Sequence, residues 1–317
     1  MKWFTTAFVL LSVQIVTASP SLVKRASVND VATLGFAALN GGTSGGAGGP
    51  TTTVSTLDAL TSAVAGDAKK TVIILGSITG DAVVLVGSNT SVLGRNAVLT
   101  GIGLRVLNVT NVIIRNVKIA KVLAPGDNIG IQSAHQVWVD HVDLSSDLDH
   151  NKDFYDGLLD ITHGCTGVTV TNSVLHDHWK GSLVGHSDSN GKEDVAITVT
   201  YANNYFFNIN SRTPSFRFGT GHLFNNVFDS NGDGINTRDG AQLLIENNVW
   251  SASKKPIYST DEGFAVQRGN DLGGVKGTVN DTVAVGTFTS PPYSYSLVAT
   301  GSVRTSVVGG VGATISF

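Results

Sequence analysis

Cysteine and charge are both scarce in this chain of 317 residues. The single cysteine, Cys165, excludes an internal disulfide, so packing and backbone hydrogen bonds must stabilise the folded state. Charged residues make up 14%, against about 25% in an average soluble protein. With a net charge of −3 the chain lacks the basic excess that nucleic acids and anionic membranes attract, so we expect neither as a partner. The 41% of hydrophobic residues suffices for a sizeable core, which predicts one large domain.

Long apolar runs are absent except in the first twenty residues, MKWFTTAFVLLSVQIVTASP. That segment joins a positive charge, an apolar stretch and small residues, which is the pattern of a secretory signal peptide. A membrane anchor would need about 20 apolar residues, and Gln14 interrupts this shorter stretch. We therefore predict a signal peptide over 1–19 and a secreted, extracellular protein. The dibasic Lys24-Arg25 is a candidate second processing site, which would leave residues 26–317 as a single mature domain.

Three N-glycosylation sequons fit a eukaryotic secretory route. They begin at Asn89, Asn108 and Asn280. Each has the N-x-S/T pattern of an acceptor site, so we expect N-linked glycans.

Glycine and short β-branched runs, by contrast, are abundant. Glycine accounts for 37 residues, which suits stacked turns better than helical bundles. Six runs each lead to a polar pivot, and successive pivots are 25, 31, 31, 22 and 22 residues apart. A variable period of about 20 to 30 residues, with little helical periodicity, is typical of an all-β solenoid whose coils stack their strands into parallel sheets. The runs are NVIIRNVKI (111–119), QVWVDHVDL (136–144), GVTVTNSVL (167–175), ITVTYANNYF (197–206), GHLFNNVF (221–228) and QLLIENNVW (242–250), with pivots at Asn116, His141, Asn172, Asn203, Asn225 and Asn247.

The pivots have a structural interpretation. Asparagines that recur at one turn can hydrogen-bond from coil to coil as a ladder and satisfy backbone groups at the bend. The alternative is a β-sandwich with Asn-rich turns, but two-residue Asn-Gly or Asp-Gly hairpins are scarce between the runs. Near the N-terminus, VSTLDALTSAVAGDAKK predicts an amphipathic helix capped by Ser55 or Thr56, which would cover the open end of the solenoid. After about Ile257 the repeat fades, and we expect the remaining chain to pack back along the outside.

Three aspartates stand out in the middle of the chain: Asp127 in APGDNIGIQ, and Asp156 and Asp160 in YDGLLDITHG. Residues four apart on a strand project from the same face, so Asp156 and Asp160 would point outward together. Neighbouring carboxylates repel each other unless a cation joins them, and oxygen ligands without His or Cys favour Ca²⁺ over zinc. A solvated pair of surface aspartates is the alternative that the spacing leaves open.

Cationic side chains follow on the later repeats. Lys180 lies in HDHWKGSLVGHSD, and Arg212 and Arg217 lie in NSRTPSFRFG, where Pro214 predicts a bend between the two arginines. Guanidinium groups suit bidentate capture of carboxylates. A cleft with calcium, a lysine and arginines would therefore hold a polyanion. The alternative is a set of ordinary exposed charges, although charge is scarce in this chain.

Four segments, taken in order, resemble the signature segments of secreted pectate lyases of polysaccharide lyase family 1, in particular those of fungal type. They are WVDHVDLS (138–145), KDFYDGLLDITHG (152–164), HDHWKGSLVGHSD (176–188) and NSRTPSFRFG (210–219). Weaker matches at TVSTLDAL (53–60) and TNVIIRNVKI (110–119) extend the resemblance over about 53–250. The resemblance implies a right-handed, single-stranded parallel β-helix, which agrees with the repeats.

The resemblance also implies roles for individual residues. One departure concerns the metal site: the family often has an acidic residue two positions before the position of Asp127, and here that residue is Pro125. Water or substrate oxygens could complete the calcium shell. The implied calcium ligands are Asp127, Asp156 and Asp160, the implied substrate-binding residues are Lys180 and Arg217, and the implied catalytic base is Arg212.

The implied reaction is calcium-dependent β-elimination in α-1,4-linked polygalacturonate, the de-esterified form of pectin, which gives 4,5-unsaturated oligogalacturonides. A guanidinium group is protonated over the ordinary pH range, so an arginine base needs nearby cations and a high pH. We therefore expect an alkaline optimum. An open groove on a solenoid favours endo cleavage, and we expect a monomer.

Three other functions remain open at this stage. A pectin lyase would act on methyl-esterified polymer without calcium, usually with the acidic site disrupted and an aromatic-rich cleft. Polygalacturonases, which are β-helical hydrolases, carry NTD, DD and GHG motifs, whereas this chain has NTRDG at 236–240 and no GHG. A non-catalytic polysaccharide-binding solenoid would not need Lys180, Arg212 and Arg217 together.

Overall fold

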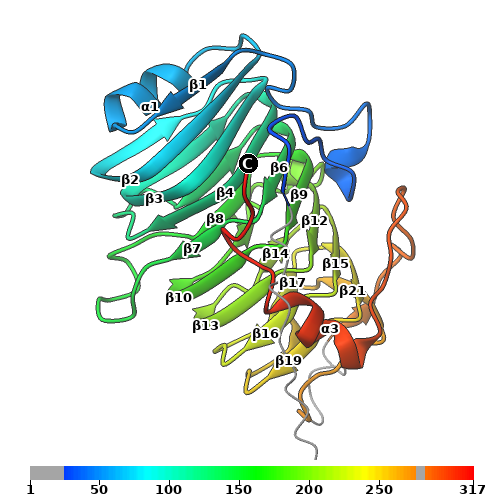
Figure 1. Cartoon of the computed structure of the whole chain (residues 1–317). Coiled ribbons are helices and arrows are strands. Elements are labelled where there is room, and N and C mark those ends of the chain that lie inside the picture. Colours follow the sequence, from blue (N-terminus) through cyan, green and yellow to red (C-terminus); the bar gives the residue numbers. More distant parts are fainter. Residues whose placement is uncertain (1–24, 276–282) are drawn as a thin grey trace, which may run out of the picture.

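The chain coils into a parallel β-helix, which Figure 1 shows from the side. This is a computed structural model that describes residues 25–275 and 283–317. The expected signal peptide, Lys24 and Asn280 lie outside the described residues. Within those residues, no helix is both long enough and apolar enough to cross a membrane. The predicted β-solenoid is confirmed.

Strands dominate the described chain, and its helices are short. The helices are the 3₁₀ helix η1 (Phe36–Ala38), α1 (Leu57–Val64), α2 (Gly191–Asp194) and α3 (Thr300–Val307). The strands are β1 (Thr51–Val54), β2 (Lys70–Leu85), β3 (Thr90–Leu107), β4 (Thr110–Ala120), β5 (Ile129–Gln132), β6 (His135–Asp140), β7 (Asp143–Ser145), β8 (Leu159–Thr162), β9 (Thr166–Thr171), β10 (Val174–Lys180), β11 (Leu183–Val184), β12 (Thr198–Ala202), β13 (Tyr205–Ser211), β14 (Ser215–Arg217), β15 (Thr220–Phe224), β16 (Val227–Asp229), β17 (Ile235–Arg238), β18 (Gln242–Glu246), β19 (Val249–Ser251), β20 (Ile257–Ser259), β21 (Phe264–Arg268) and β22 (Ala284–Val285).

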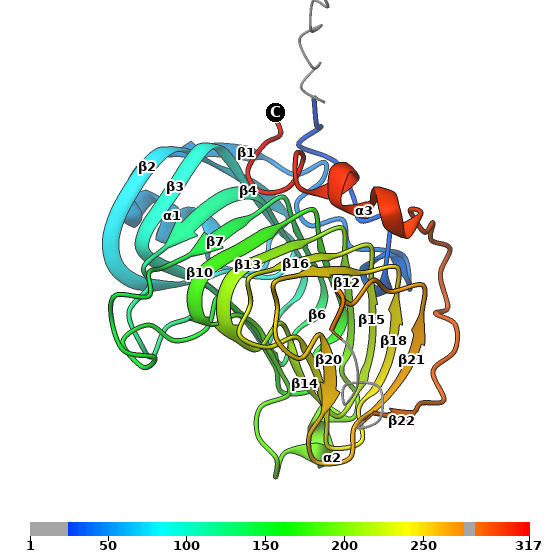
Figure 2. The ribbon, with the colours of Figure 1, turned by 90° about the horizontal axis from the view of Figure 1, so that it is seen from below.

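Each coil contributes one strand to each of three parallel sheets. We call them the β8 sheet (β5, β8, β11, β14, β17, β20), the β10 sheet (β7, β10, β13, β16, β19) and the β12 sheet (β6, β9, β12, β15, β18, β21). Strands β2 and β3 are long because they pair continuously around the corners of the first coils. Figure 2 shows the sheets surrounding one core.

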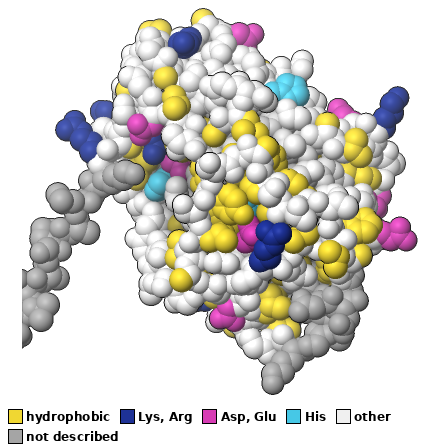
Figure 3. Space-filling view, turned by 90° about the vertical axis from the view of Figure 1, so that its right-hand side faces the viewer, with side chains coloured by type: hydrophobic (Ala, Val, Ile, Leu, Met, Phe, Trp, Pro, Cys, Tyr) yellow, Lys and Arg dark blue, Asp and Glu magenta, His cyan; other side chains and the backbone are white. Residues whose placement is uncertain are grey.

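In-register stacking of β-branched and aromatic side chains forms that core. In the β12 sheet, Val137 pairs with Val168, and Val168 pairs with Val199 on the next coil. Larger rings stack later, with the centroids of Phe206 and Phe228 4.9 Å apart. Alternate residues of a strand face the core, which explains the short runs seen in the sequence. The outer surface in Figure 3 shows few charged side chains.

The predicted pivots are corner residues, but the predicted ladder is displaced by one position. Asn116, His141, Asn172, Asn203, Asn225 and Asn247 all have a positive φ, between 49° and 61°. Asparagine tolerates this left-handed conformation better than most residues, and it turns the chain from the β12 sheet into the β10 sheet. The buried hydrogen-bonded ladder is formed instead by the following residues, Asn204, Asn226, Asn248 and Asn270.

Helices α1 and α3 pack against the β-helix. The side chain of Thr56 caps α1, and Leu60 and Val64 of this helix are fully buried at the N-terminal end of the core. The expectation that the repeat fades after Ile257 was wrong, because β20, β21 and β22 continue the stacking. The chain after β22 does return along the outside, where α3 contacts β16 and β19 (Figure 1).

Candidate active site

The outer face of the β8 sheet and the turns at its edges carry the predicted site residues. Loop 146–158 precedes β8, and loop 185–197, which contains α2, follows β11. Figure 2 shows α2 projecting at one edge of this sheet. The strands are only two to four residues long, so the neighbouring turns decide where most of the functional side chains lie.

Asp127 and Asp160 are buried carboxylates from successive coils. Asp127 Oδ1 accepts a hydrogen bond from the Gly157 N–H at 2.9 Å, and Asp160 Oδ1 accepts one from the Leu183 N–H at 2.9 Å. Burial raises the pKa of Asp127 to about 6, and the Asp156 charge adds to that rise. Burial and the Asp127 charge raise the pKa of Asp160 well above its usual value. The two carboxylates therefore lie close enough to repel each other.

Asp156 lies in the loop before β8 and not on the strand. The expectation of one strand face for Asp156 and Asp160 was wrong, because β8 begins only at Leu159 and both Leu158 and Leu159 face the core. The carboxylate of Asp156 instead contacts the Lys180 Nζ at 2.8 Å. Asp156 still raises the pKa values of both other aspartates through its charge, so the three form one acidic cluster.

The acidic cluster fits a hard cation in its donor chemistry. Over residues 25–275 and 283–317, no three His, Cys, Asp or Glu side chains surround a common point as a ready metal site. Asp156 is turned toward Lys180, which accounts for the missing third ligand. Asp127 and Asp160 each use one oxygen for a backbone N–H, and their second oxygens accept no hydrogen bond from the described chain. Repelling carboxylates with unused oxygens are the groups that Ca²⁺ binds.

Arg212 lies at the bend after β13, as Pro214 predicted, and has a φ of 63°. Its carbonyl accepts a hydrogen bond from the Ser182 N–H of the preceding coil at 2.7 Å. The positive charge of its side chain lowers the pKa of Asp160. The structure therefore brings Arg212 and Lys180 together with the acidic cluster.

Arg217 lies on the same sheet in a separate group of ion pairs. Its Nε is 2.5 Å from Asp188 Oδ1 and 3.6 Å from Asp239 Oδ2. Arg217 is in register with Arg238 on the next coil, and Arg238 Nη2 is 3.1 Å from the same Asp188 oxygen. Arg217 and Arg238 therefore share the Asp188 carboxylate.

Sequence reasoning missed several of these neighbours. Arg238 lies in the NTRDG segment that was weighed only as a hydrolase motif, although a second arginine one coil after Arg217 was a usable signal. His178 on β10 is another such neighbour. It is buried, its Nε2 lies 2.6 Å from the Asp156 carbonyl, and burial lowers its pKa to about 4. A neutral His178 therefore donates to the loop that carries Asp156.

Cys165 and two of the sequons have clear environments. Cys165 is fully buried, and burial raises the pKa of its thiol to about 12, so it is no nucleophile. Asn108 is exposed. Asn89 is half-buried, and its amide donates to the Asp67 carbonyl at 3.0 Å while its Oδ1 accepts from Asn111.

Known proteins resemble this chain over nearly its whole length. The sequence profile described as pectate lyase matches residues 6–315. The probable pectate lyase A of Aspergillus niger is 55% identical, and the alignment covers 100% of this chain and 99% of that protein. Pectate lyase A of Emericella nidulans is 58% identical over 93% of this chain and 90% of that protein.

Solved structures give the same result. The pectate lyase of Bacillus sp. N165, crystallised in complex with trigalacturonate, superposes with a TM-score of 0.78 at 29% identity, covering 89% of this chain and 99% of that one. Pectate lyase II of Xanthomonas campestris has a TM-score of 0.79 at 24% identity, which supports the fold. The resemblance that the four motifs indicated is confirmed: this chain belongs to the pectate lyase family and is a polysaccharide lyase.

Proposed function

We propose that this pectate lyase cleaves α-1,4-linked polygalacturonate by calcium-dependent β-elimination, with Arg212 as the base. The observation that carries the proposal is the placement of Arg212 and Lys180 beside three mutually repelling aspartates on one face of the helix. A trigalacturonate complex of a structural relative supports the substrate class.

Lys180 and Arg217 provide charges for uronate carboxylates. Both side chains are currently neutralised by aspartates, Lys180 by Asp156 and Arg217 by Asp188. A substrate carboxylate can take the place of either aspartate without leaving a cation unpaired. Because uronate carboxylates repeat along the polymer, two cationic positions, Lys180 at the end of β10 and Arg217 on β14, would fix both its register and its direction.

Asp127, Asp156 and Asp160 would hold the Ca²⁺ ion. Bound there, calcium would neutralise the uronate carboxylate and so stabilise the negative charge that develops when the neighbouring carbon loses its proton. To serve as a ligand, Asp156 would have to release Lys180, which a substrate carboxylate could then bind. In this proposal the three carboxylates serve as ligands, and Arg212 serves as the base.

The elimination moves one proton and breaks one bond. Arg212 in its neutral form takes the proton at C5 of the uronate, the electron pair forms the C4–C5 double bond, and the bond from C4 to the glycosidic oxygen breaks. The leaving oxygen takes a proton from solvent, and no water enters the sugar products. Since the base must be neutral, the rate should rise toward alkaline pH.

We propose endo cleavage, in which a polymer would cross the outer face of the β8 sheet. The described coils expose the β8 sheet between loops 146–158 and 185–197. We also propose that the protein acts as a monomer.

Ultraviolet absorbance of the unsaturated uronate tests this function directly. We expect purified protein to generate the signal on polygalacturonate at alkaline pH with added Ca²⁺, and excess chelator to abolish it. Arg212→Ala should lose at least about 1,000-fold in kcat, because general-base catalysis contributes about 100- to 10,000-fold and the guanidinium charge is lost as well. Arg304→Ala, which removes an arginine far from this sheet, is the matched control.

Two results would contradict the proposal. A chelator-resistant signal on highly methylated pectin, with none on polygalacturonate, would identify a pectin lyase and remove the three aspartates from a metal site. An acidic pH optimum would exclude Arg212 as the base.

The same proposal includes secretion and processing. Arg25 pairs with Ser316 in an isolated parallel bridge, and the Ala26 N–H donates to the Ser316 carbonyl at 2.8 Å. Cleavage after Arg25 would keep this second contact at the new N-terminus.

Among the described sequons, Asn108 is the better glycan acceptor, because the Asn89 amide is hydrogen-bonded. Intact mass and peptide mapping of the secreted protein would test both statements.

A further inference from the structure

The backbone of Arg212 leaves the regular hydrogen bonding between parallel strands, and both neighbouring coils bond to it at this point. Ser211, the last residue of β13, bonds normally, with its carbonyl accepting from the Gly181 N–H at 2.9 Å. At Arg212 the backbone has the left-handed conformation, which costs a side-chain-bearing residue of order 1 kcal/mol or more. Within the described chain, no main-chain carbonyl accepts the Arg212 N–H.

A side-chain carboxylate from the following coil takes the place of that carbonyl. Asp233 Oδ2 accepts the Arg212 N–H at 3.3 Å and the Tyr258 hydroxyl at 2.9 Å. The Thr213 hydroxyl donates to the Asp233 carbonyl at 3.1 Å, so the two turns are joined twice. With the Ser182 bond to its carbonyl, the Arg212 peptide is therefore held from both sides.

Two glycines allow Asp233 to approach this closely. A Cβ at Gly232 would lie 2.3 Å from the Asn210 carbonyl oxygen, and a Cβ at Gly234 would lie 2.0 Å from the Pro256 carbonyl oxygen. Both distances are far shorter than any real contact. The Gly-Asp-Gly turn therefore fits tightly between the coil of Arg212 and the coil of Tyr258.

The second carboxylate oxygen of Asp233 takes part in no hydrogen bond within the described residues. Asp233 Oδ1 is buried and accepts no hydrogen bond from the described residues. Burial raises the pKa of Asp233 to about 6, so the group is ionised at the alkaline pH where the lyase should work. Burying a carboxylate with one unused oxygen destabilises the fold, and such costs are concentrated at functional sites.

We propose that Asp233 is a positioning residue of the lyase: it fixes the left-handed backbone of Arg212, and thereby the direction of the guanidine, while Tyr258 fixes Asp233. The inference rests on the proposed role of Arg212 as the base. It assigns Asp233 no contact with substrate. The charge of the Arg212 side chain acts on Asp160 of the acidic cluster.

Kinetics of four variants test this inference on polygalacturonate with Ca²⁺. A misplacement of about 1 Å at a reacting group can cost about 100-fold, so we expect Asp233→Ala to lower kcat by about 100-fold and Asp233→Asn by about tenfold. KM should stay within about twofold in both, since Lys180 and Arg217 are untouched. Tyr258→Phe should lower kcat less than Asp233→Asn does. Tyr205→Phe is the matched control, because it removes an equivalent hydroxyl bond to Asp229, of 3.0 Å, away from Arg212.

A double variant separates positioning from a merely structural role. If Asp233 acts through Arg212, Asp233→Asn should not reduce the residual rate of Arg212→Ala any further. The inference would be overturned if Asp233→Asn lowered kcat by the same factor in the Arg212→Ala variant as in the unmodified protein. It would also be overturned if kcat were unchanged in Asp233→Asn and in Tyr258→Phe. An Arg212→Ala variant with full activity would instead refute the proposed base itself, which is a distinct outcome.

Discussion

At the scale of single residues, the buried carboxylates of Asp127 and Asp160 lower the free energy of unfolding when they are charged. Both carboxylates are about nine-tenths buried. Burial raises the pKa of each, the Asp156 charge raises that of Asp127 further, and the Asp127 charge raises that of Asp160 further. A carboxyl group whose folded pKa lies above its unfolded value stabilises the folded state less as pH rises. For Asp127 this loss begins near its unfolded pKa and is complete above about pH 6.

Asp127→Asn should therefore stabilise the cation-free protein and abolish its response to calcium. A rise from 3.8 to about 6 corresponds to about 2 to 3 kcal/mol above pH 6, which the neutral amide would recover. Calcium should raise the Tm of the unmodified protein, because a ligand that binds only the folded state stabilises it. Thermal unfolding at pH 8 in chelator and across a calcium titration measures both effects.

The control for this prediction is Asp81→Asn, which removes an exposed carboxylate on β2. It should leave both the chelator and calcium curves nearly unchanged. If calcium raised the Tm of Asp127→Asn as much as that of the unmodified protein, Asp127 would not be a ligand.

The sequence located most of this site but not its geometry. Asp127, Asp160, Lys180 and Arg212 are brought together. Asp156 lies in a loop, because the strand-face argument assumed a strand that already includes residue 156, whereas β8 begins at Leu159. Asp233 could not have been singled out from the sequence. Its role depends on a broken ladder at Arg212, and backbone conformation at a turn is decided by the neighbouring coils.

The asparagine ladder shows, at the scale of structural elements, why a coil of short strands remains in register. Asn226 is fully buried and uses its whole amide: its Oδ1 accepts from the Asn204 N–H, and its Nδ2 donates to the Tyr201 carbonyl, both at 2.9 Å. It also donates to Asn248 at 2.9 Å. The ladder thus satisfies backbone groups at a corner where strand pairing cannot reach them.

Asn226→Ala should lower the free energy of unfolding by about 3 to 5 kcal/mol, because several buried donors and acceptors are left without partners at about 1 to 3 kcal/mol each. Asn270→Ala, at the partly exposed end of the ladder, should lower it less. Urea unfolding compares the two variants. Equal losses at the buried and terminal positions would contradict a role for the ladder in burying these groups.

The sequence predicted that asparagines would stack, but not which asparagines. The pairs Asn203-Asn204 and Asn225-Asn226 place two identical residues side by side with different tasks. The first adopts the left-handed corner, and the second enters the core. Composition cannot separate these tasks, since asparagine suits both a positive φ and a buried hydrogen-bonded position.

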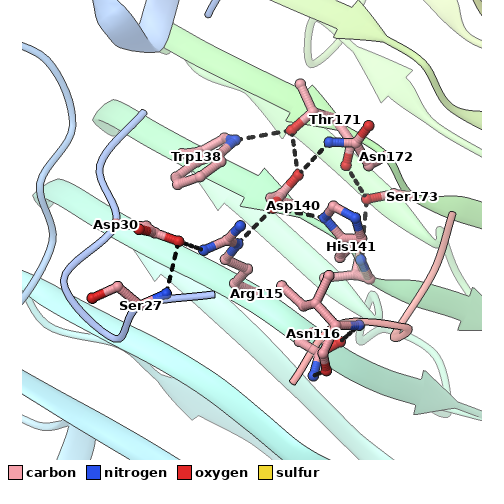
Figure 4. A network of polar contacts seen from close by, with 12 residues as sticks. Ser27, Asp30, Arg115, Asn116, Trp138, Asp140, His141, Thr171, Asn172 and Ser173 are labelled. Carbon is pink, nitrogen blue, oxygen red and sulfur yellow. Dashed lines mark hydrogen bonds and ion pairs between the residues drawn. The ribbon is translucent and has the colours of Figure 1, made fainter. Parts of the chain in front are cut away.

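At the scale of the whole molecule, a polar network around Arg115 joins the segments near Asp30 and Phe317 to the outer surface of the β-helix. Arg115 on β4 pairs with Asp140 at 2.6 Å and with Asp30 of the N-terminal segment at 2.7 Å (Figure 4). Its guanidinium also lies over the rings of Trp138 and of the C-terminal residue Phe317, 4.9 and 5.7 Å from their centroids. A cavity of about 850 Å³ opens between the two ends here, on a different face from the β8 sheet.

Asp140 depends on this network for its charge. Burial opposes its ionisation, but the hydrogen bond from His141 and the charges of His141 and Arg115 outweigh burial and hold the pKa of Asp140 below its usual value. Asp140 also accepts hydrogen bonds from Thr171 and Asn172. The network therefore ties the segments around Asp30 and Phe317 to the outside of the β-helix.

Arg115→Ala should destabilise the protein without affecting the chemistry of the site. Removing one partner of a buried ion pair costs about 3 to 5 kcal/mol, because the other charge remains buried. Lys118→Ala, which breaks an exposed pair with Asp143, should cost less than about 1 kcal/mol. Since Arg115 holds both termini, limited proteolysis of the variant should cut first near residues 26–35 and 312–317, and kcat of the intact fraction at 25 °C should be unchanged. Urea unfolding, mass analysis of the fragments and the ultraviolet assay measure the three effects.

First cuts in loop 146–158, or a fall in kcat with the chain still folded, would contradict this prediction. Either result would show that the network supports the active site rather than the packing of the chain ends.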